Sequence, residues 1–386
     1  MKAVVYSSDN PVLRLALEEI KRKLEESRVI TDFDFVIIAL NYKYPYEDLD
    51  KNIRKIFNIN SQDYFAFHAT ESFANTYTTE GISAVFIKFE SKGKVKVFTA
   101  EGLTDYKGNN LLFKLVDYLE ENKNNLNIFI SSWRDAGLGF FIEDLGKELE
   151  KREFYPNLVG GVSSGEVFNG EFRTFQFHNN KVIRDGFGVI TFENVEFTIG
   201  ISLGFKPLSP VYKATKVEGC QIYEVDDGKN FKEIVSKFLK GLEPKVEYLW
   251  YCPIILLDDR EGYVSVQRTF KSINEDSVEF FAPIPPDCKF MLSFGTPEIL
   301  LESTQKEIER MKENITTADL VFNFSCIARQ YVLEERREEE NLLYAYHFDA
   351  PLFGFSTYGE IGPDKFKKKV KLYNETSLGI AIKERE

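Results

Sequence analysis

A short phrase that occurs twice constrains this chain more than any other feature of its sequence. It reads NLVGGVSSGE at Asn157–Glu166 and PLFGFSTYGEIG at Pro351–Gly362. Each copy begins with apolar residues, turns through glycine and small hydroxyl side chains, and then reaches Gly-Glu. This pattern predicts a buried strand whose end stays small and polar, so that another backbone or a ligand can come close. Two such ends in one chain indicate a duplicated framework.

The residues around each phrase extend the duplication to a larger unit. An apolar, strand-like run lies at a similar distance upstream of each copy, at Asn127–Trp133 and at Leu320–Cys326. A charged, helix-like stretch separates this run from the phrase, and a further apolar run begins downstream at Gly186 and at Ser377. The predicted unit is therefore strand, helix, strand, strand. Proteins of the α/β class also produce this order without duplication.

A fainter third copy opens the chain. Its apolar runs begin at Phe35, Tyr64 and Gly81, with a helix-like stretch after the first. The middle phrase has lost the Gly-Glu ending and carries His68 instead. The sequence thus predicts two copies of the unit, with a weaker third before them.

These patterns predict an α/β (α+β) protein of two related halves, in which mixed and antiparallel sheets are covered by helices. Prolines at positions 207 and 210 interrupt a strand-rich stretch. We place the boundary there, which gives domains of residues 1–204 and 205–386. The strand ends with the repeated phrase are expected to line a cleft between the halves, a common position for small-molecule sites.

Two helices are marked by their ends. One begins at Pro297, with Thr296 as its cap, and runs to about Asn314. The other has Asn10 as its expected cap and Pro11 in its first turn. The inward face of this second helix is predicted to contain Leu13, Leu17, Ile20 and Leu24.

Composition excludes several classes of function. The formal charge of -12 and the pI near 5.1 disfavour a nucleic-acid partner, which calls for a basic surface. No run approaches the roughly 18 to 20 apolar residues that cross a bilayer, and the opening MKAVVYSS does not resemble a signal peptide. We therefore expect a cytoplasmic protein without membrane insertion.

Metal and redox chemistry are not indicated by the cysteines. Cys220, Cys252, Cys288 and Cys326 lie far apart and form no Cys-x-x-Cys pair, which argues against a zinc site or thioredoxin-like chemistry. No Walker loop, dinucleotide-binding glycine pattern or metal-binding histidine pair is visible. We predict no metal site and reduced thiols.

The chain resembles the FIST family, which combines a FIST N and a FIST C sensory domain. The resemblance covers nearly the whole chain, and its motifs occur in the order of the family. They are GGVSSGE (Gly160–Glu166), GFKPLSPVYKATKVEGCQIYEVDDG (Gly204–Gly228), FNFSCIAR (Phe322–Arg329), FGFSTYGEIG (Phe353–Gly362) and NETSLGIAI (Asn374–Ile382).

One motif departs from the family. Members usually have a Gly-Cys-Ser-Thr-Ala-Gly-Glu-like phrase where this chain has FAFHATES, Phe65–Ser72. The resemblance implies a sensory role with small ligands such as amino acids, and with haem in some nitric-oxide-responsive members. No kinase, cyclase or methyl-accepting region accompanies the motifs, so we expect either signalling through a separate, unidentified protein or a free-standing binder.

The candidate ligand residues follow from the chemistry of an amino acid. Glu166 and Glu360 follow small residues in the two phrases, where a carboxylate could receive an ammonium group. Arg329 follows a predicted strand, and its guanidinium could hold a carboxylate by two hydrogen bonds. The alternative is that each glutamate tightens its own turn and the arginine pairs with a structural acid. Further hydroxyl contacts are expected from Ser163, Ser164, Ser356 and Thr357.

Two rival functions use other residues. A haem-binding gas sensor would need an axial ligand, for which His68, His178 and His347 are candidates, with the Cys326 thiolate as an alternative. A serine hydrolase could use Ser163, which stands in a Gly-x-Ser-x-Gly pattern. That pattern requires a helix directly after the serine, and the residues that follow predict a turn and a strand instead.

Overall fold

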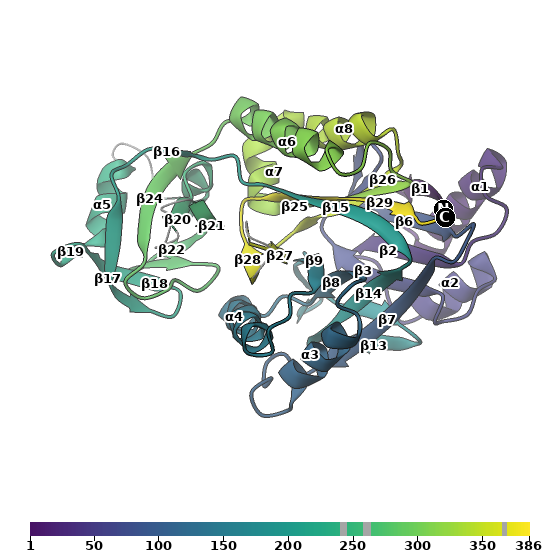
Figure 1. Cartoon of the computed structure of the whole chain (residues 1–386), viewed down its shortest axis with the longest axis horizontal. Helices are drawn as coiled ribbons and strands as arrows, with labels where there is room; N and C mark the ends of the chain where they lie inside the picture. Colours follow the sequence, from purple (N-terminus) through teal and green to yellow (C-terminus); the bar gives the residue numbers. More distant parts are fainter. Residues whose placement is uncertain (240–244, 258–263, 365–368) are drawn as a thin grey trace.

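The structure is a computed structural model that describes residues 1–239, 245–257, 264–364 and 369–386. It confirms the α/β class, with mixed and antiparallel sheets covered by helices (Figure 1). None of the helices within these residues is long and apolar enough to cross a membrane.

One unit of four strands occurs three times along the chain. Its helices lie between the first and second strands and between the second and third. The first unit contains β1 (Lys2–Ser8), α1 (Leu13–Ser27), β2 (Phe35–Asn41), α2 (Leu49–Phe57), β3 (Tyr64–Ala69) and β6 (Ile82–Lys88). The second contains β7 (Lys94–Glu101), α3 (Leu111–Glu121), β8 (Leu126–Ser131), α4 (Asp135–Lys151), β9 (Asn157–Val162) and β14 (Gly186–Glu193). The third contains β15 (Val195–Ser202), α6 (Pro297–Lys312), β25 (Leu320–Cys326), α7 (Ile327–Leu333), the 3₁₀ turn η2 (Glu334–Arg336), α8 (Arg337–Phe348), β26 (Leu352–Thr357) and β29 (Ser377–Glu384).

The three units have the same strand order. Each sheet begins with the first strand of its unit, followed by the fourth, the second and the third, as in β1-β6-β2-β3, β7-β14-β8-β9 and β15-β29-β25-β26. The second and third strands are parallel and the other neighbours are antiparallel. The faint third copy at the start of the sequence is therefore a complete unit. The molecule is organised as three such units rather than as two halves.

Each unit sends a hairpin to the sheet of another unit. The hairpin that follows β3 pairs with β26, the one that follows β26 pairs with β9, and one that follows β9 pairs with β3. The exchange is thus circular. The repeated phrase lies where the chain passes from the sheet of its own unit to the sheet of another. The hairpins are β4 (Ser72–Ala74) with β5 (Tyr77–Thr79), β27 (Glu360–Pro363) with β28 (Val370–Tyr373), and β12 (Gln176–His178) with β13 (Lys181–Ile183).

One apolar core joins the three sheets. Buried side chains from β2, β3, β8, β25, β26 and β29 meet in it, with contacts such as the Phe67 and Phe355 rings at 4.6 Å. Separate clusters lie under the outer helices: α1 and α2 cover the first sheet, α3 and α4 the second, and α6 and α8 the third. These helix pairs occupy three different sides of the molecule in Figure 1. Both faces of the central strands are covered, which explains their continuous apolar runs.

A further domain is inserted into the third unit, between β15 and α6, and stands apart from the three sheets in Figure 1. It has its own core and, in the described residues, nine strands. The predicted boundary between residues 204 and 205 falls where the chain enters this domain. Its elements are β16 (Lys206–Pro207), β17 (Tyr212–Glu218), β18 (Gln221–Val225), β19 (Lys229–Asn230), α5 (Phe231–Phe238), the 3₁₀ helix η1 (Val246–Tyr251), β20 (Ile254–Leu257), β21 (Val264–Arg268), β22 (Phe270–Ile273), β23 (Val278–Phe280) and β24 (Lys289–Phe294).

Candidate functional site

The three strand-end phrases meet at one point of the structure. The Ser164 hydroxyl, from the second unit, accepts a hydrogen bond from the Thr70 amide of the first unit at 2.9 Å. It also donates to the Ser356 carbonyl of the third unit at 2.5 Å. The Ser356 amide in turn donates to the Glu71 carbonyl at 3.0 Å. One small hydroxyl side chain thus links all three units, which accounts for the serine at position 164.

The glycines of the phrase allow this close approach. A Cβ atom on Gly161 would lie 2.6 Å from the Thr357 methyl group, and one on Gly165 would lie 1.6 Å from the Arg173 carbonyl oxygen. Contacts this short are incompatible with a side chain. The small residues are therefore required by packing between units, whatever else the region does.

A cleft of about 450 Å³ lies at the ends of these strands. Its lining residues come from all three units, and most of them lie at or after the ends of β2, β3, β9 and β25. One more, Trp250, comes from the inserted domain. Open α/β sheets commonly bind ligands at the carboxyl ends of their strands. The lining residues are Asn41, Tyr42, Lys43, Thr70, Glu71, Glu80, Glu166, Trp250, Ile327, Gln330, Tyr331 and Arg337.

The cleft contains charges of both signs. Arg337 pairs with Glu71, with Nη1 and Oε1 at 2.7 Å, and Lys43 lies 3.9 Å from Glu80. The Tyr42 hydroxyl donates to Glu166 at 2.8 Å, and burial together with this carboxylate raises the pKa of Tyr42 to about 12. No described cation forms an ion pair with Glu166, which is exposed. This carboxylate is available to a cationic group.

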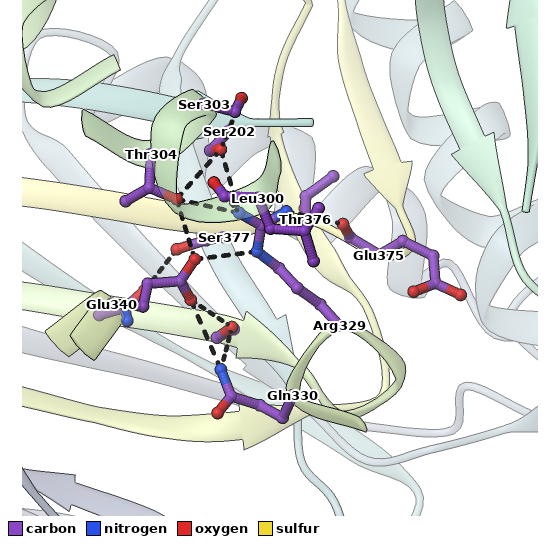
Figure 2. A network of polar contacts seen from close by, with 12 residues as sticks. Ser202, Leu300, Ser303, Thr304, Arg329, Gln330, Glu340, Glu375, Thr376 and Ser377 are labelled. Atoms are coloured by element: carbon purple, nitrogen blue, oxygen red, sulfur yellow. Dashed lines mark hydrogen bonds and ion pairs between the residues drawn. The ribbon is translucent and has the colours of Figure 1, made fainter. Parts of the chain in front are cut away.

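Arg329 does not reach the cleft. Its side chain is fully buried and forms an ion pair with the equally buried Glu340, with Nε and Oε1 at 2.9 Å (Figure 2). Its remaining nitrogens donate to partners that include the Leu203 carbonyl at 3.1 Å and the Thr304 hydroxyl at 2.9 Å. The expected two-point contact between Arg329 and a ligand carboxylate does not fit this geometry. The structural-acid alternative describes the observed contacts.

Arg329 instead fixes the position of α7. The next two residues of this helix, Gln330 and Tyr331, line the cleft. Gln330 donates to the Ser325 hydroxyl at 2.6 Å and lies beside the same Glu340 carboxylate, at 3.4 Å (Figure 2). Arg329 is thus a positioning residue for one wall of the cleft.

The residues of the phrases divide between the cleft and the core beneath it. Glu166 lines the cleft, whereas Ser163, Ser164, Ser356 and Thr357 are fully buried. Glu360 is buried as well, and accepts hydrogen bonds from the Thr357 and Thr376 hydroxyls. Burial raises the pKa of Glu360 to about 8, so that it is largely protonated at neutral pH. Glu360 is not among the described residues that line the cleft.

The haem candidates do not fit a haem site. His68 is fully buried, and its ring packs against Phe175 and Phe177 at 5.4 and 5.1 Å. Its Nδ1 accepts from the Phe175 amide at 3.3 Å, while Nε2 has no partner, and burial lowers its pKa to about 3. His68, His178 and His347 do not line the cleft, and the described partner of His178 is the Tyr64 carbonyl, 2.8 Å from its Nδ1.

The hydrolase geometry is likewise not formed. The Ser163 hydroxyl accepts a hydrogen bond from the Gln176 amide at 3.0 Å, and no described histidine contacts it. The element after the phrase is the short strand β10 (Val167–Phe168), paired with β11 (Glu171–Phe172), rather than a helix. Ser163 therefore lacks both the base and the exposed turn that a nucleophile requires.

Several residues of the cleft were not identified from the sequence. Glu71 lies in FAFHATES, the phrase that lacks the Gly-Glu ending, and Arg337 lies in a run of charges that reads as an ordinary solvated helix. Glu71 still follows its strand at the same edge of the molecule as Glu166. The signal that could have found it is the alignment of the third copy with the other two.

Comparisons with known proteins agree with the sequence motifs. A family model described as the FIST N domain matches residues 34–228, and one described as the FIST C domain matches residues 237–363. An uncharacterized protein of Aquifex aeolicus (strain VF5) is 60% identical over 262 residues, which are 68% of this chain and 97% of the relative. A solved structure of T. maritima PurL complexed with FGAR covers 99% of this chain and 72% of its own at 8% identity, with a TM-score of 0.22. A score this low does not indicate a shared fold.

Proposed function

The chain belongs to the FIST family of sensory domains, and we propose that it senses a small zwitterion of the amino-acid class in the cleft at the strand ends. The observation that carries the proposal is the Glu166 carboxylate, which lies in this cleft with a tyrosine hydroxyl as its partner and without a described cation. An exposed carboxylate beside other acids attracts an ammonium group. The nearby Glu71 and Glu80 strengthen this preference.

The cleft also offers groups for a ligand carboxylate. Arg337 and Lys43 line it, and each is paired with a glutamate of the same cleft. A zwitterion can insert between such pairs, because it presents one charge to each partner. The three acids and two cations among the described lining residues therefore suit an α-amino acid better than a simple anion or cation.

Aromatic rings provide an apolar wall. Tyr42 comes from the first unit, Tyr331 from α7, and Trp250 from the inserted domain. The Trp250 and Tyr331 rings lie edge to face at 5.3 Å, across the contact between the inserted domain and the third unit. A ligand side chain against these rings would gain contacts from both parts of the protein.

This arrangement supports a mechanism for sensing. A ligand that contacts Trp250 and the three units together favours the arrangement of the inserted domain in which all of these contacts form. A separate signalling protein in the cytoplasm would respond to this shift in population. The shift is limited by the difference in ligand affinity between the two arrangements.

The test begins with a thermal-shift screen against the proteinogenic amino acids, since a ligand of the folded state raises the melting temperature. Isothermal titration of the selected amino acid then compares Glu166→Gln and Arg337→Ala with the unaltered protein. Each variant removes a charge-assisted hydrogen bond, so affinity should fall by about 10- to 100-fold. Arg336→Ala is the matched control, because this neighbouring arginine pairs with Glu298 and Glu339 outside the cleft. Unchanged affinity in both cleft variants would contradict the proposal.

A further inference from the structure

A second cleft, of about 400 Å³, lies between the second unit and the inserted domain. Helix α4 and strand β28 form one side, and β20 and β21 of the inserted domain form the other. None of its described lining residues belongs to the first cleft. The two sites are therefore separate, and the inserted domain contributes to both.

The cleft contains an arginine that forms no ion pair with any described carboxylate. Arg268, at the end of β21, is only 6% exposed. It donates to three backbone carbonyls, those of Pro283, Gln267 and Leu372, each at 3.0 Å, through Nε and Nη1. Nη2 donates to none of the described residues, and no described carboxylate lies within ion-pair distance of the guanidinium. A buried charge in this state is costly unless an anion pairs with it.

Apolar side chains form part of the walls of the cleft. They include Ile142 of α4, Leu256 and Val266 of the inserted domain, and Leu372 of β28. Gly139 of α4 permits the close contact, because a Cβ there would lie 2.2 Å from the Pro283 ring. A ligand with an apolar body could thus bury its length while one end reaches the arginine.

Glu143 is an acidic residue that lines the same cleft as Arg268. It lines the cleft from α4, and burial raises the pKa of its carboxyl group while the charge of Arg268 acts in the opposite direction. The two side chains are close enough to influence each other but form no ion pair. Lys147 and Lys369 also line the cleft, and they pair with Asp144 and Glu150, respectively.

We propose that this cleft binds a monoanion with an apolar body, of the medium-chain or aryl carboxylate class, with its carboxylate against Arg268. The free Nη2 donor and the buried positive charge recognise the anion, and the aliphatic walls recognise the body of the ligand. Arg268 of the inserted domain also donates to the Leu372 carbonyl of β28, a strand of the second sheet. A ligand bound to Arg268 would therefore stabilise the contact between the inserted domain and this sheet.

The probe for this site is decanoate, titrated calorimetrically into the full chain, with decanol as the uncharged control. Decanoate should bind saturably and at least about tenfold more tightly than decanol, the difference expected for one charge-assisted contact. Arg268→Met should remove this preference. Equal affinity for the two probes would overturn the proposal.

Glu143→Gln keeps the proposal testable even if Arg268→Met does not fold. The amide removes a negative charge that opposes the ligand, so decanoate affinity should rise by about 3- to 10-fold and decanol affinity should not change. Arg337→Ala, in the first cleft, should leave decanoate binding unaltered. An unchanged affinity in Glu143→Gln, or a loss in Arg337→Ala, would show that decanoate does not occupy this cleft.

Discussion

At the scale of single residues, burial decides what each charged side chain does. Arg329 and Arg337 are eight positions apart in the sequence, and both carry the charge that a ligand carboxylate needs. Arg329 is fully buried against Glu340, whereas Arg337 is 42% exposed on its side chain and lines the cleft. The sequence shows the charge but not the burial, because Arg329 is covered by α6 and by the chain after β15.

The buried Arg329–Glu340 pair should contribute strongly to stability. Arg329→Met leaves an uncompensated carboxylate in the core, so the free energy of unfolding should fall by about 3–5 kcal/mol in urea denaturation. Arg336→Met breaks the exposed pair with Glu339 and should cost less than about 1 kcal/mol. A loss of similar size in the two variants would contradict the structural role of Arg329.

The raised pKa values of Glu360 and Glu375 should make the protein less stable as the pH rises through the neutral range. Burial raises the pKa of each carboxyl group from 4.5 to about 8. The unfolded chain therefore releases these protons at lower pH than the folded chain does. Stability should fall as the pH rises from about 4.5 toward 8, because the folded state binds more protons over this range.

The variant Glu360→Gln isolates this effect. Its amide does not titrate, so the loss of unfolding free energy between about pH 5 and about pH 8 should shrink by a few kcal/mol, given ~1.4 kcal/mol for each pKa unit. Glu335→Gln, at an exposed position, serves as the control and should leave the profile unchanged. If Glu360→Gln shows the same profile as the unaltered protein, Glu360 is already ionised in the folded state.

At the scale of elements, local signals in the sequence located the helices well. Thr296 accepts from the Ile299 amide at 3.4 Å and Pro297 begins α6, as predicted. Leu13, Leu17, Ile20 and Leu24 are all buried on α1. The cap of α1 differs from the prediction. Asn10 accepts from the Val12 amide at 3.0 Å in a turn before the helix, which starts at Leu13.

The repeated phrase was identified correctly as the end of a strand. Its glycines are expected to be sensitive to substitution, because they lie where the units pack together. Gly165→Ala places a Cβ 1.6 Å from the Arg173 carbonyl and should destabilise the protein by about 1–3 kcal/mol. Gly137→Ala, in α4, meets nothing within 4 Å and should be neutral or stabilising by up to about 1 kcal/mol. Thermal unfolding of the two variants compares them directly. Equal melting temperatures would mean that the chain around Gly165 is not tightly packed.

At the scale of the whole molecule, the repeat predicted the last three strands of each unit and the helix between the first two of these strands, but not the strand and helix that open the unit. The repeat gives the succession of elements but not the order of the strands in each sheet, which the structure supplies. The circular exchange of hairpins is not predicted either, because β4, β12 and β27 are short strands whose sequences do not indicate which sheet they join. The exchange is what brings Thr70, Ser164 and Ser356 together and creates a cleft from three units.

The proposed function requires that the ligand binds in this cleft. A crystal structure of the protein with the amino acid selected by thermal shift would locate the ligand. We expect ligand density between Glu166 and the Glu71–Arg337 pair, with the ligand side chain toward Trp250 and Tyr331. Density for the amino acid at another position, with this cleft empty at a saturating concentration, would contradict the proposed function.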